Sequence, residues 1–211
     1  VWPEEPMDFA RRAGELWEAL CKSAWTFPLK DGLEPLTPPT LTEVRDRAIG
    51  RLRGLIPGQA NEEAVVALLR EMTAPLDRIS MASDVVCRLR GTPVVLDFKL
   101  AYGSNEKGNR NRLCDVAWAY RKWDALTDLR MLVLREENNG YLDSLRTGPG
   151  RWTVVTGRDV YDNVAEITGL DVSALVDEVV DFSADLSDAS LKHFTDRGVS
   201  GYLDWRCIGK P

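Results

Sequence analysis

Apolar residues recur along the chain at helical spacing in three segments. Residues 7–25, 61–72 and 109–126 each repeat apolar side chains every three or four positions, which predicts amphipathic helices. A fourth helix is predicted to begin at Thr40, because Thr40 and Glu43 have the spacing of a capping box. Proline-rich or polar stretches separate these helices.

Four other segments have the pattern of β-strands. Residues 84–89 and 94–100 read as a hairpin joined by the sequence RGTP, and 129–135 and 151–157 are apolar runs typical of buried strands. Short acidic helices are predicted over most of 158–196. The order of these elements predicts an α/β fold, with a mixed central β-sheet flanked by helices on both faces and extra helices at both ends.

The length of 211 residues predicts a single domain. We expect its core at 60–157, with helical segments at 1–58 and 158–211. No apolar run reaches the roughly 18 residues that cross a bilayer, and the first residues lack the pattern of a signal peptide. The four cysteines form no C-x-x-C pair, so we expect reduced thiols and a cytoplasmic protein.

Charge is distributed unevenly along the chain, whose net charge is −6. Residues 84–122 contain eight Lys and Arg against four Asp and Glu, a net +4, whereas 159–188 contain nine Asp and Glu and no Lys or Arg, a net −9. A local basic field can bind a polyanion even when the whole molecule is acidic. Uneven surface charge is also common in proteins without such a partner.

The predicted hairpin carries two carboxylates and an amine, those of Asp84, Asp97 and Lys99. A loop of two residues, Gly91-Thr92, or of four, 90–93, places Asp84 opposite Lys99. We favour the longer loop, because Pro93 has no N–H with which to close the shorter one. Residues two apart on a strand share a face, so the three charged side chains are predicted to project to the same side of the sheet.

This trio has two interpretations. Two aspartates on a cross-strand diagonal lie roughly 7–8 Å apart and can converge on one divalent cation, with Lys99 beside them to orient a water. Alternatively, Asp84 and Lys99 form an ordinary cross-strand salt bridge, and Asp97 is left over. An ionised group in an apolar strand is costly unless it is paired or holds a metal. The salt bridge would leave Asp97 without a partner, which favours the interpretation as a cation site.

The spacing of Ser83-Asp84, twelve further residues and Asp97-Phe98-Lys99 resembles the signature of the PD-(D/E)XK nuclease superfamily, with Ser83 in place of the usual proline. The resemblance covers about residues 60–157. The family core runs helix, strand, strand, strand, helix, strand, and its first strand is not placed by this sequence. The resemblance implies a restriction-endonuclease-like catalytic core.

The resemblance also implies a chemistry, which is hydrolysis of DNA phosphodiesters with one or two Mg²⁺ ions to leave a 5′-phosphate. Asp84, Asp97 and the backbone carbonyl of Phe98 would hold the metal, and Lys99 would position the water. In many family members a glutamate of the leading helix joins the metal site. Glu62 is the candidate for this role, because it shares the apolar side of its predicted helix.

The segment after Lys99 is rich in side chains that hold phosphates and read base edges. The candidate DNA contacts are Asn105, Lys107, Asn109, Arg110, Asn111 and Arg112. A solvated polar loop ahead of a helix would have a similar composition.

With this segment, the chain looks most like a small type II restriction endonuclease of a restriction–modification system. A palindromic DNA site would call for a homodimer. The alternatives are a junction-resolving, repair or RNA-directed nuclease of the same superfamily, and a non-enzymatic α/β interaction module.

Overall fold

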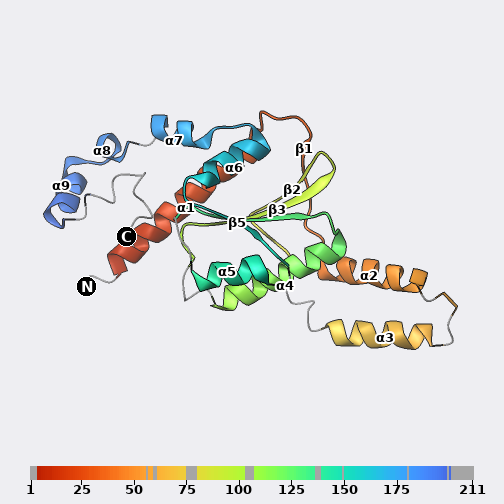
Figure 1. The fold of residues 1–211 in the computed structure, drawn as a ribbon. Coiled ribbons are helices and arrows are strands. Elements are labelled where there is room, and N and C mark those ends of the chain that lie inside the picture. The colour runs from red at the N-terminus through yellow and green to blue at the C-terminus, as the bar shows by residue number, and fades with distance from the viewer. Residues whose placement is uncertain are drawn as a thin grey trace.

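The computed structural model describes residues 4–55, 57–58, 61–74, 80–102, 107–135, 139–148, 150–179, 181–198 and 200, and their side chains except those of 4–13, 107–109, 179 and 182–183. Five strands form one open, mixed sheet in the order β1-β2-β3-β4-β5 (Figure 1). The strands are β1 (Leu33–Pro35), β2 (Val85–Leu89), β3 (Thr92–Lys99), β4 (Asp128–Val133) and β5 (Thr153–Thr156).

The first three strands pair antiparallel, and β3, β4 and β5 pair parallel. Parallel neighbours need a crossover connection. The helix α4 (Lys107–Trp123) connects β3 to β4, and α5 (Gly140–Thr147) connects β4 to β5.

Helices cover both faces of the sheet (Figure 1). On one face lie α1 (Glu4–Thr26), α6 (Asp159–Thr168) and α7 (Val172–Val179), and on the other lie α2 (Leu41–Leu55), α4 and α5. Outside these layers are α3 (Glu62–Thr73), α8 (Phe182–Asp185) and α9 (Asp188–Asp196). The predicted α/β fold with a mixed, helix-flanked sheet is confirmed.

Each face of the sheet has its own apolar core, anchored by a tryptophan. On the α1 side, Trp17 packs edge-on against Phe98 of β3, with ring centroids 5.7 Å apart. On the α4 side, the indole N–H of Trp152 donates a hydrogen bond of 3.1 Å to the carbonyl of Leu113. The first contact holds α1 against the strand that carries Asp97, and the second holds α4 to the segment before β5 on the opposite face of the sheet.

The turn of the β2–β3 hairpin differs from both predicted loops. It consists of Arg90 and Gly91, with φ of 49° and 89°, and it is closed by the pair Leu89 and Thr92. A two-residue turn with positive φ at both centres matches the twist of the strands, and Gly91 adopts that conformation without strain. Pro93, which argued for the longer loop, lies inside β3.

The pairing is therefore shifted by two residues from the predicted register, since Val85 pairs with Leu96. One further step along this ladder aligns Asp84 with Asp97, and not with Lys99 as predicted. A shift of two residues leaves every side chain on its expected face. Asp97 and Lys99 accordingly still share one face of β3.

Two elements were not predicted from the sequence. β1 has three residues, too few to show a strand period, and it pairs at the sheet edge with β2. α5 begins at a cap, Asn139, whose side chain accepts hydrogen bonds from the N–H groups of Tyr141 and Leu142. Across the described residues, no helix combines the length and the apolar character that a membrane crossing demands.

Substitution of Gly150 tests how closely the segment before β5 approaches α4. A Cβ at this position would lie 2.1 Å from Ala117 Cβ. We expect Gly150→Ala to lower the free energy of unfolding by about 1–3 kcal/mol, measured in urea. The control is Gly50→Ala in α2, where nothing lies within 4 Å; it should raise stability by about 0.5–1 kcal/mol. Equal effects of the two substitutions would contradict this packing.

Candidate active site

Asp97 lies in the most buried strand of the sheet, and 3 % of its side chain is exposed. Among the side chains that the structure describes, it is the one Asp, Glu, Lys or Arg that is buried. Burial raises the pKa of Asp97; the positive charges of Lys99 and Arg112 oppose this rise, and the negative charge of Asp84 adds to it. The net shift is upward, so its carboxylate is incompletely compensated.

Two cations approach the Asp97 carboxylate. Lys99 Nζ lies 2.7 Å from Oδ1, and an Arg112 Nη of α4 lies 4.0 Å from Oδ2. Burial lowers the pKa of Lys99, but the charges of Asp97, Asp84 and Glu18 outweigh it and the net shift is upward. Despite the short ionic contact, Oδ1 accepts no well-oriented hydrogen bond from the described residues. Lys99 therefore offsets the charge of Asp97 without saturating its oxygens.

Asp84 is positioned by the backbone of the neighbouring strand. Its Oδ2 accepts a hydrogen bond of 2.7 Å from the N–H of Phe98, so its side chain continues the hairpin ladder beyond Val85. Its Oδ1 lies 3.3 Å from Lys22 Nζ of α1. The ion pair of Asp84 is thus with Lys22, whereas the predicted salt bridge placed Lys99 there.

α1 supplies two groups that were not predicted from the sequence. Glu18 and Lys22 are one helical turn apart, with 2.5 Å between Oε1 and Nζ. Glu18 also contributes to the raised pKa of Lys99, which places it at the same cluster. The sequence pattern shows that these residues flank the apolar stripe of a helix. It does not show that this stripe packs beside Asp84, because Asp84 is 62 residues from Lys22.

Glu62 is brought to a different place from the one predicted. It lies on α3, where its Oε1 is 3.3 Å from Arg53 Nε of α2 and its Oε2 accepts a hydrogen bond from the N–H of Gly58. Figure 1 shows α3 beside α2 and away from the sheet. The structure therefore joins Glu62 to Arg53 and not to the two aspartates, which corrects its assignment as a metal ligand.

Three of the six candidate DNA contacts cannot be placed. Asn105 lies outside the described residues, and the side chains of Lys107 and Asn109 are not described. Arg110 and Asn111 begin the described surface of α4. An Arg110 Nη lies 3.0 Å from Asn111 Oδ1, and both residues line a cavity of about 540 Å³ between α4 and α5. This position leaves the two side chains accessible to a ligand.

Arg112 has a different environment from its neighbours. It makes long hydrogen bonds of 3.5 and 3.4 Å to the carbonyls of Ser80 and Ala82, just before Asp84, and it also approaches Asp97. Arg112 therefore ties α4 to the segment that carries Asp84. Its geometry suits an electrostatic role in the cluster better than the predicted base contact.

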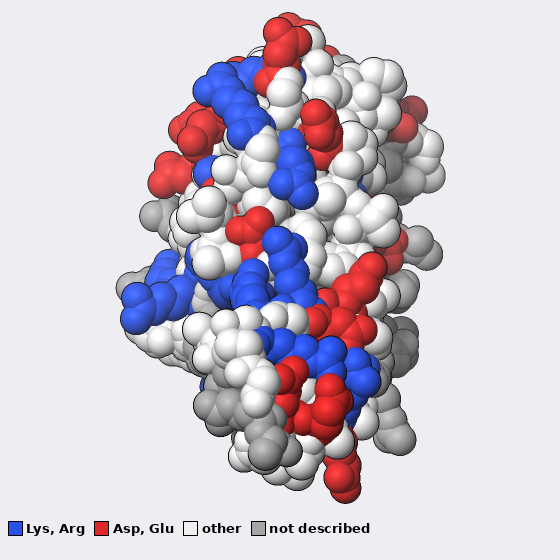
Figure 2. Space-filling model, turned by 90° about the vertical axis from the view of Figure 1, so that its right-hand side faces the viewer, with Lys and Arg blue, Asp and Glu red and all other residues white. Residues whose placement is uncertain are grey.

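The face that carries α2 and α3 has mixed charge. Figure 2 shows Lys and Arg across the middle of this face with Asp and Glu among them. Arg53 pairs with Glu63 at 2.9 Å and Arg70 with Asp46 at 3.5 Å, while Arg51 donates to carbonyls at the end of α4. These cations hold α2, α3 and α4 together, so this face is a poorer candidate for a polyanion than the start of α4.

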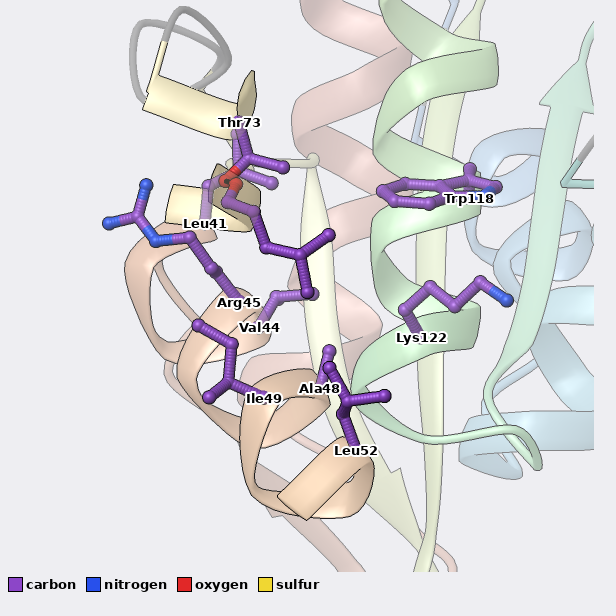
Figure 3. Close-up of a pocket in the computed structure, with 10 residues that line it drawn as sticks. Leu41, Val44, Arg45, Ala48, Ile49, Leu52, Thr73, Trp118 and Lys122 are labelled. Carbon is purple, nitrogen blue, oxygen red and sulfur yellow. Dashed lines mark hydrogen bonds between the residues drawn. The ribbon is translucent and has the colours of Figure 1, made fainter. Parts of the chain in front are cut away.

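An apolar cavity of about 320 Å³ opens between α2, α3 and α4 (Figure 3). Leu52 of α2, Leu69 of α3 and Trp118 of α4 contribute to its lining, and Arg45 and Lys122 are the charged residues that line it. Among the described residues that line it there is no carboxylate, thiol or imidazole. The cavity therefore offers apolar surface but no group for acid–base chemistry, and the charged cluster around Asp97 remains the candidate active site.

Comparisons of the chain with protein-family models, with curated proteins and with solved structures find no match.

The cluster has the donors that Mg²⁺ uses in proteins. Within the described residues, no three or more His, Cys, Asp and Glu side chains are grouped closely enough to enclose a metal ion. Mg²⁺, however, is usually held by one or two carboxylates and keeps several waters. Asp84 and Asp97 meet that requirement, since they align at the end of the hairpin and Asp97 Oδ1, although close to Lys99 Nζ, accepts no well-oriented hydrogen bond from the described residues.

The raised pKa of Asp97 predicts how stability depends on pH. When the folded pKa exceeds the unfolded one, ionisation of the carboxyl group opposes folding. The wild-type protein therefore loses free energy of unfolding as pH rises from about 4 through the folded pKa of Asp97. We expect the free energy of unfolding of Asp97→Asn, relative to wild type, to increase as pH rises from 4 to 7 in EDTA. Urea unfolding at a series of pH values measures this difference. A difference that does not change with pH would show that Asp97 is fully compensated.

Proposed function

We propose that the chain is a Mg²⁺-dependent endonuclease that hydrolyses phosphodiesters of double-stranded DNA, in the manner of a type II restriction enzyme. The observation that carries the proposal is the buried Asp97 carboxylate, aligned with Asp84 and 2.7 Å from Lys99 Nζ. A buried, incompletely compensated carboxylate at the end of a hairpin is typical of a functional site.

The order of elements supports the proposal. α1, β1, β2, β3, α4 and β4 follow one another as helix, strand, strand, strand, helix and strand, with α2 and α3 inserted between β1 and β2. This is the order expected from the PD-(D/E)XK resemblance. In this alignment α1, and not the helix before the hairpin, is the leading helix, so Glu18 takes the place predicted for Glu62.

Asp84, Asp97 and the backbone carbonyl of Phe98 would hold one or two Mg²⁺ ions, with Glu18 beside them. When bound, Mg²⁺ lowers the pKa of a water and stabilises charge on the phosphate oxygens. Lys99 orients the attacking water and offsets negative charge as it develops on the phosphate. The carboxyl–amine contact along β3 keeps Lys99 Nζ at the cluster before substrate arrives.

Arg110 and Asn111 are the proposed DNA contacts, because they lie at the accessible start of α4, directly after β3. The first turn of α4 contains no acidic residue, and a helix N-terminus adds positive potential that suits phosphate. Lys107 lies in the same turn. The 5′-phosphate product, a homodimer on a palindromic site and a cytoplasmic location remain predictions of this proposal.

Two alternatives make different predictions. A junction-resolving, repair or RNA-directed nuclease would use the same carboxylates on another substrate. A non-enzymatic α/β interaction module would retain the pairs Lys99–Asp97 and Lys22–Asp84 only as ordinary ion pairs, so divalent ions would leave its melting temperature unchanged.

Cleavage of a long DNA tests the proposal directly. We expect the purified protein with Mg²⁺ to cut plasmid or phage DNA into discrete fragments on a gel, and EDTA to abolish cutting. Asp97→Ala should lower the initial rate at least about a hundred-fold, because it removes charge that acts on the reacting centre. Mg²⁺ should also raise the melting temperature of wild type but not of Asp97→Ala.

The matched control is Asp128→Ala, which removes a carboxylate of β4 that pairs with Arg130 at 2.8 Å, outside the cluster. It should retain cleavage. A metal-dependent smear would leave a nuclease without sequence specificity, and cutting of four-way junctions alone would favour a resolving enzyme. Intact duplex, junction and RNA substrates, together with an unchanged melting temperature, would contradict the nuclease proposal.

DNA binding should depend on Arg110. With Ca²⁺ as the divalent ion, Arg110→Ala should weaken binding and reduce the slope of log K against log salt by about 0.9, the value for one phosphate contact. Fluorescence anisotropy with a labelled duplex measures both quantities. Arg70→Ala in α3, whose guanidinium pairs with Asp46, is the control and should leave the slope unchanged. Equal slopes for wild type and Arg110→Ala would exclude this contact.

A further inference from the structure

Lys22 contacts the one carboxylate oxygen of Asp84 that accepts no hydrogen bond from the backbone of the described residues. Asp84 Oδ2 accepts the hydrogen bond from the N–H of Phe98, while Oδ1 faces Lys22 Nζ at 3.3 Å. The same ammonium lies 2.5 Å from Glu18 Oε1. Lys22 therefore bridges two of the three carboxylates in the cluster, one from a helix and one from the hairpin.

Lys22 and Lys99 differ in how firmly they are held. Lys99 lies two residues after Asp97 on the same face of β3, and its side chain is 25 % exposed, beside a carboxylate that is 3 % exposed. Lys22 is 35 % exposed and pairs with an Asp84 side chain that is 22 % exposed. Partly exposed ion pairs are weak, so the contact of Lys22 with Asp84 is the easier of the two to break.

A cavity next to Asp84 can accept the Lys22 ammonium when it moves away from the carboxylate. Lys22 and Asp84 both line a cavity of about 320 Å³ between the end of α1 and strands β1 and β2, together with Trp25 and Leu33. The flexible stem of a lysine lets its ammonium turn toward solvent while the stem stays packed. Lys22 can therefore leave Asp84 without leaving the site.

Charge balance favours such an exchange. The carboxylates of Glu18, Asp84 and Asp97 carry three negative charges, and Lys22, Lys99 and Arg112 carry three positive charges, so the cluster is neutral as it stands. A divalent ion added to a neutral cluster creates an excess of two positive charges. Departure of the Lys22 ammonium lowers this excess to one.

We propose that Lys22 is a built-in counter-cation that a divalent ion must displace from Asp84 and Glu18, so that Lys22 sets the metal concentration at which the site loads. This inference rests on the proposed function, because it concerns the same carboxylates. Lys22 stabilises the metal-free cluster and competes with the metal. It is a positioning residue that acts through Asp84.

Metal titration of Lys22→Met in the full chain tests this role. Methionine keeps most of the length of the stem and removes the charge. Isothermal titration with Mg²⁺ and, separately, Ca²⁺ should give a Kd for Lys22→Met at least about three-fold lower than that of wild type. Lys22→Arg, which retains the charge, should stay near the wild-type Kd. The Mg²⁺ concentration for half-maximal DNA cleavage should fall in parallel.

Lys192→Met in α9 is the matched control, because Lys192 makes an ion pair of the same kind, one turn from Asp196 at 2.8 Å. Its Kd for metal should equal that of wild type. Thermal unfolding in EDTA checks that each variant is folded. If Lys22→Met does not fold, Lys22→Gln takes its place in the titration.

The outcomes separate this inference from the proposed function. If wild type binds metal and cuts DNA but the Kd of Lys22→Met is equal or higher, Lys22 is not a competitor and the inference is overturned while the nuclease stands. If Lys22→Met binds metal and wild type does not, the inference is supported. If neither protein binds Mg²⁺ or Ca²⁺, the inference and the metal-dependent nuclease both fail.

Discussion

Burying the Asp97 carboxylate in β3 requires positive charge on the same side of the sheet, and β3 itself and α4 supply it. Lys99 follows two residues later on the strand, and Arg112 reaches the carboxylate from α4. Breaking a buried ion pair by removing one partner costs about 3–5 kcal/mol, because the remaining charge stays buried. The placement of α4 against the strand is thus coupled to the ionisation of Asp97, and the upward shift of its pKa shows that the compensation is incomplete.

Apolar packing on the opposite face decides which charges reach the end of the hairpin. Trp17 of α1 packs against Phe98, and the backbone N–H of Phe98 in turn holds Asp84. Glu18 directly follows Trp17 in α1, and Lys22 lies one turn after Glu18, so the packing that buries the tryptophan also brings this acid–lysine pair to the site. A hydrophobic contact and an electrostatic cluster are therefore parts of one arrangement.

The charges of α2 and α3 serve a different purpose from those of the cluster. Arg53 and Arg70 join the two helices through exposed ion pairs, which contribute little stability each. The described lining of the apolar cavity that α2 and α3 form with α4 includes two cations and no carboxylate. These helices are inserted between β1 and β2, so they extend the sheet core without supplying a group to the cluster around Asp97. Natural proteins depart from full charge compensation mainly at functional sites, so the cluster around Asp97, and not this pair of helices, is the candidate site.

The sequence by itself determined the α/β class, the main helices and four of the five strands, because the periods of apolar residues depend only on local backbone geometry. It also determined that Asp97 and Lys99 share a face, a conclusion that survived the wrong loop because a shift of two residues preserves sidedness. Only the tertiary structure decided the hairpin register, the pairing of Asp84 with Lys22, and the presence of Glu18 in place of Glu62. These depend on the backbone angles of Arg90 and Gly91 and on contacts between residues far apart in the chain, which no local pattern specifies.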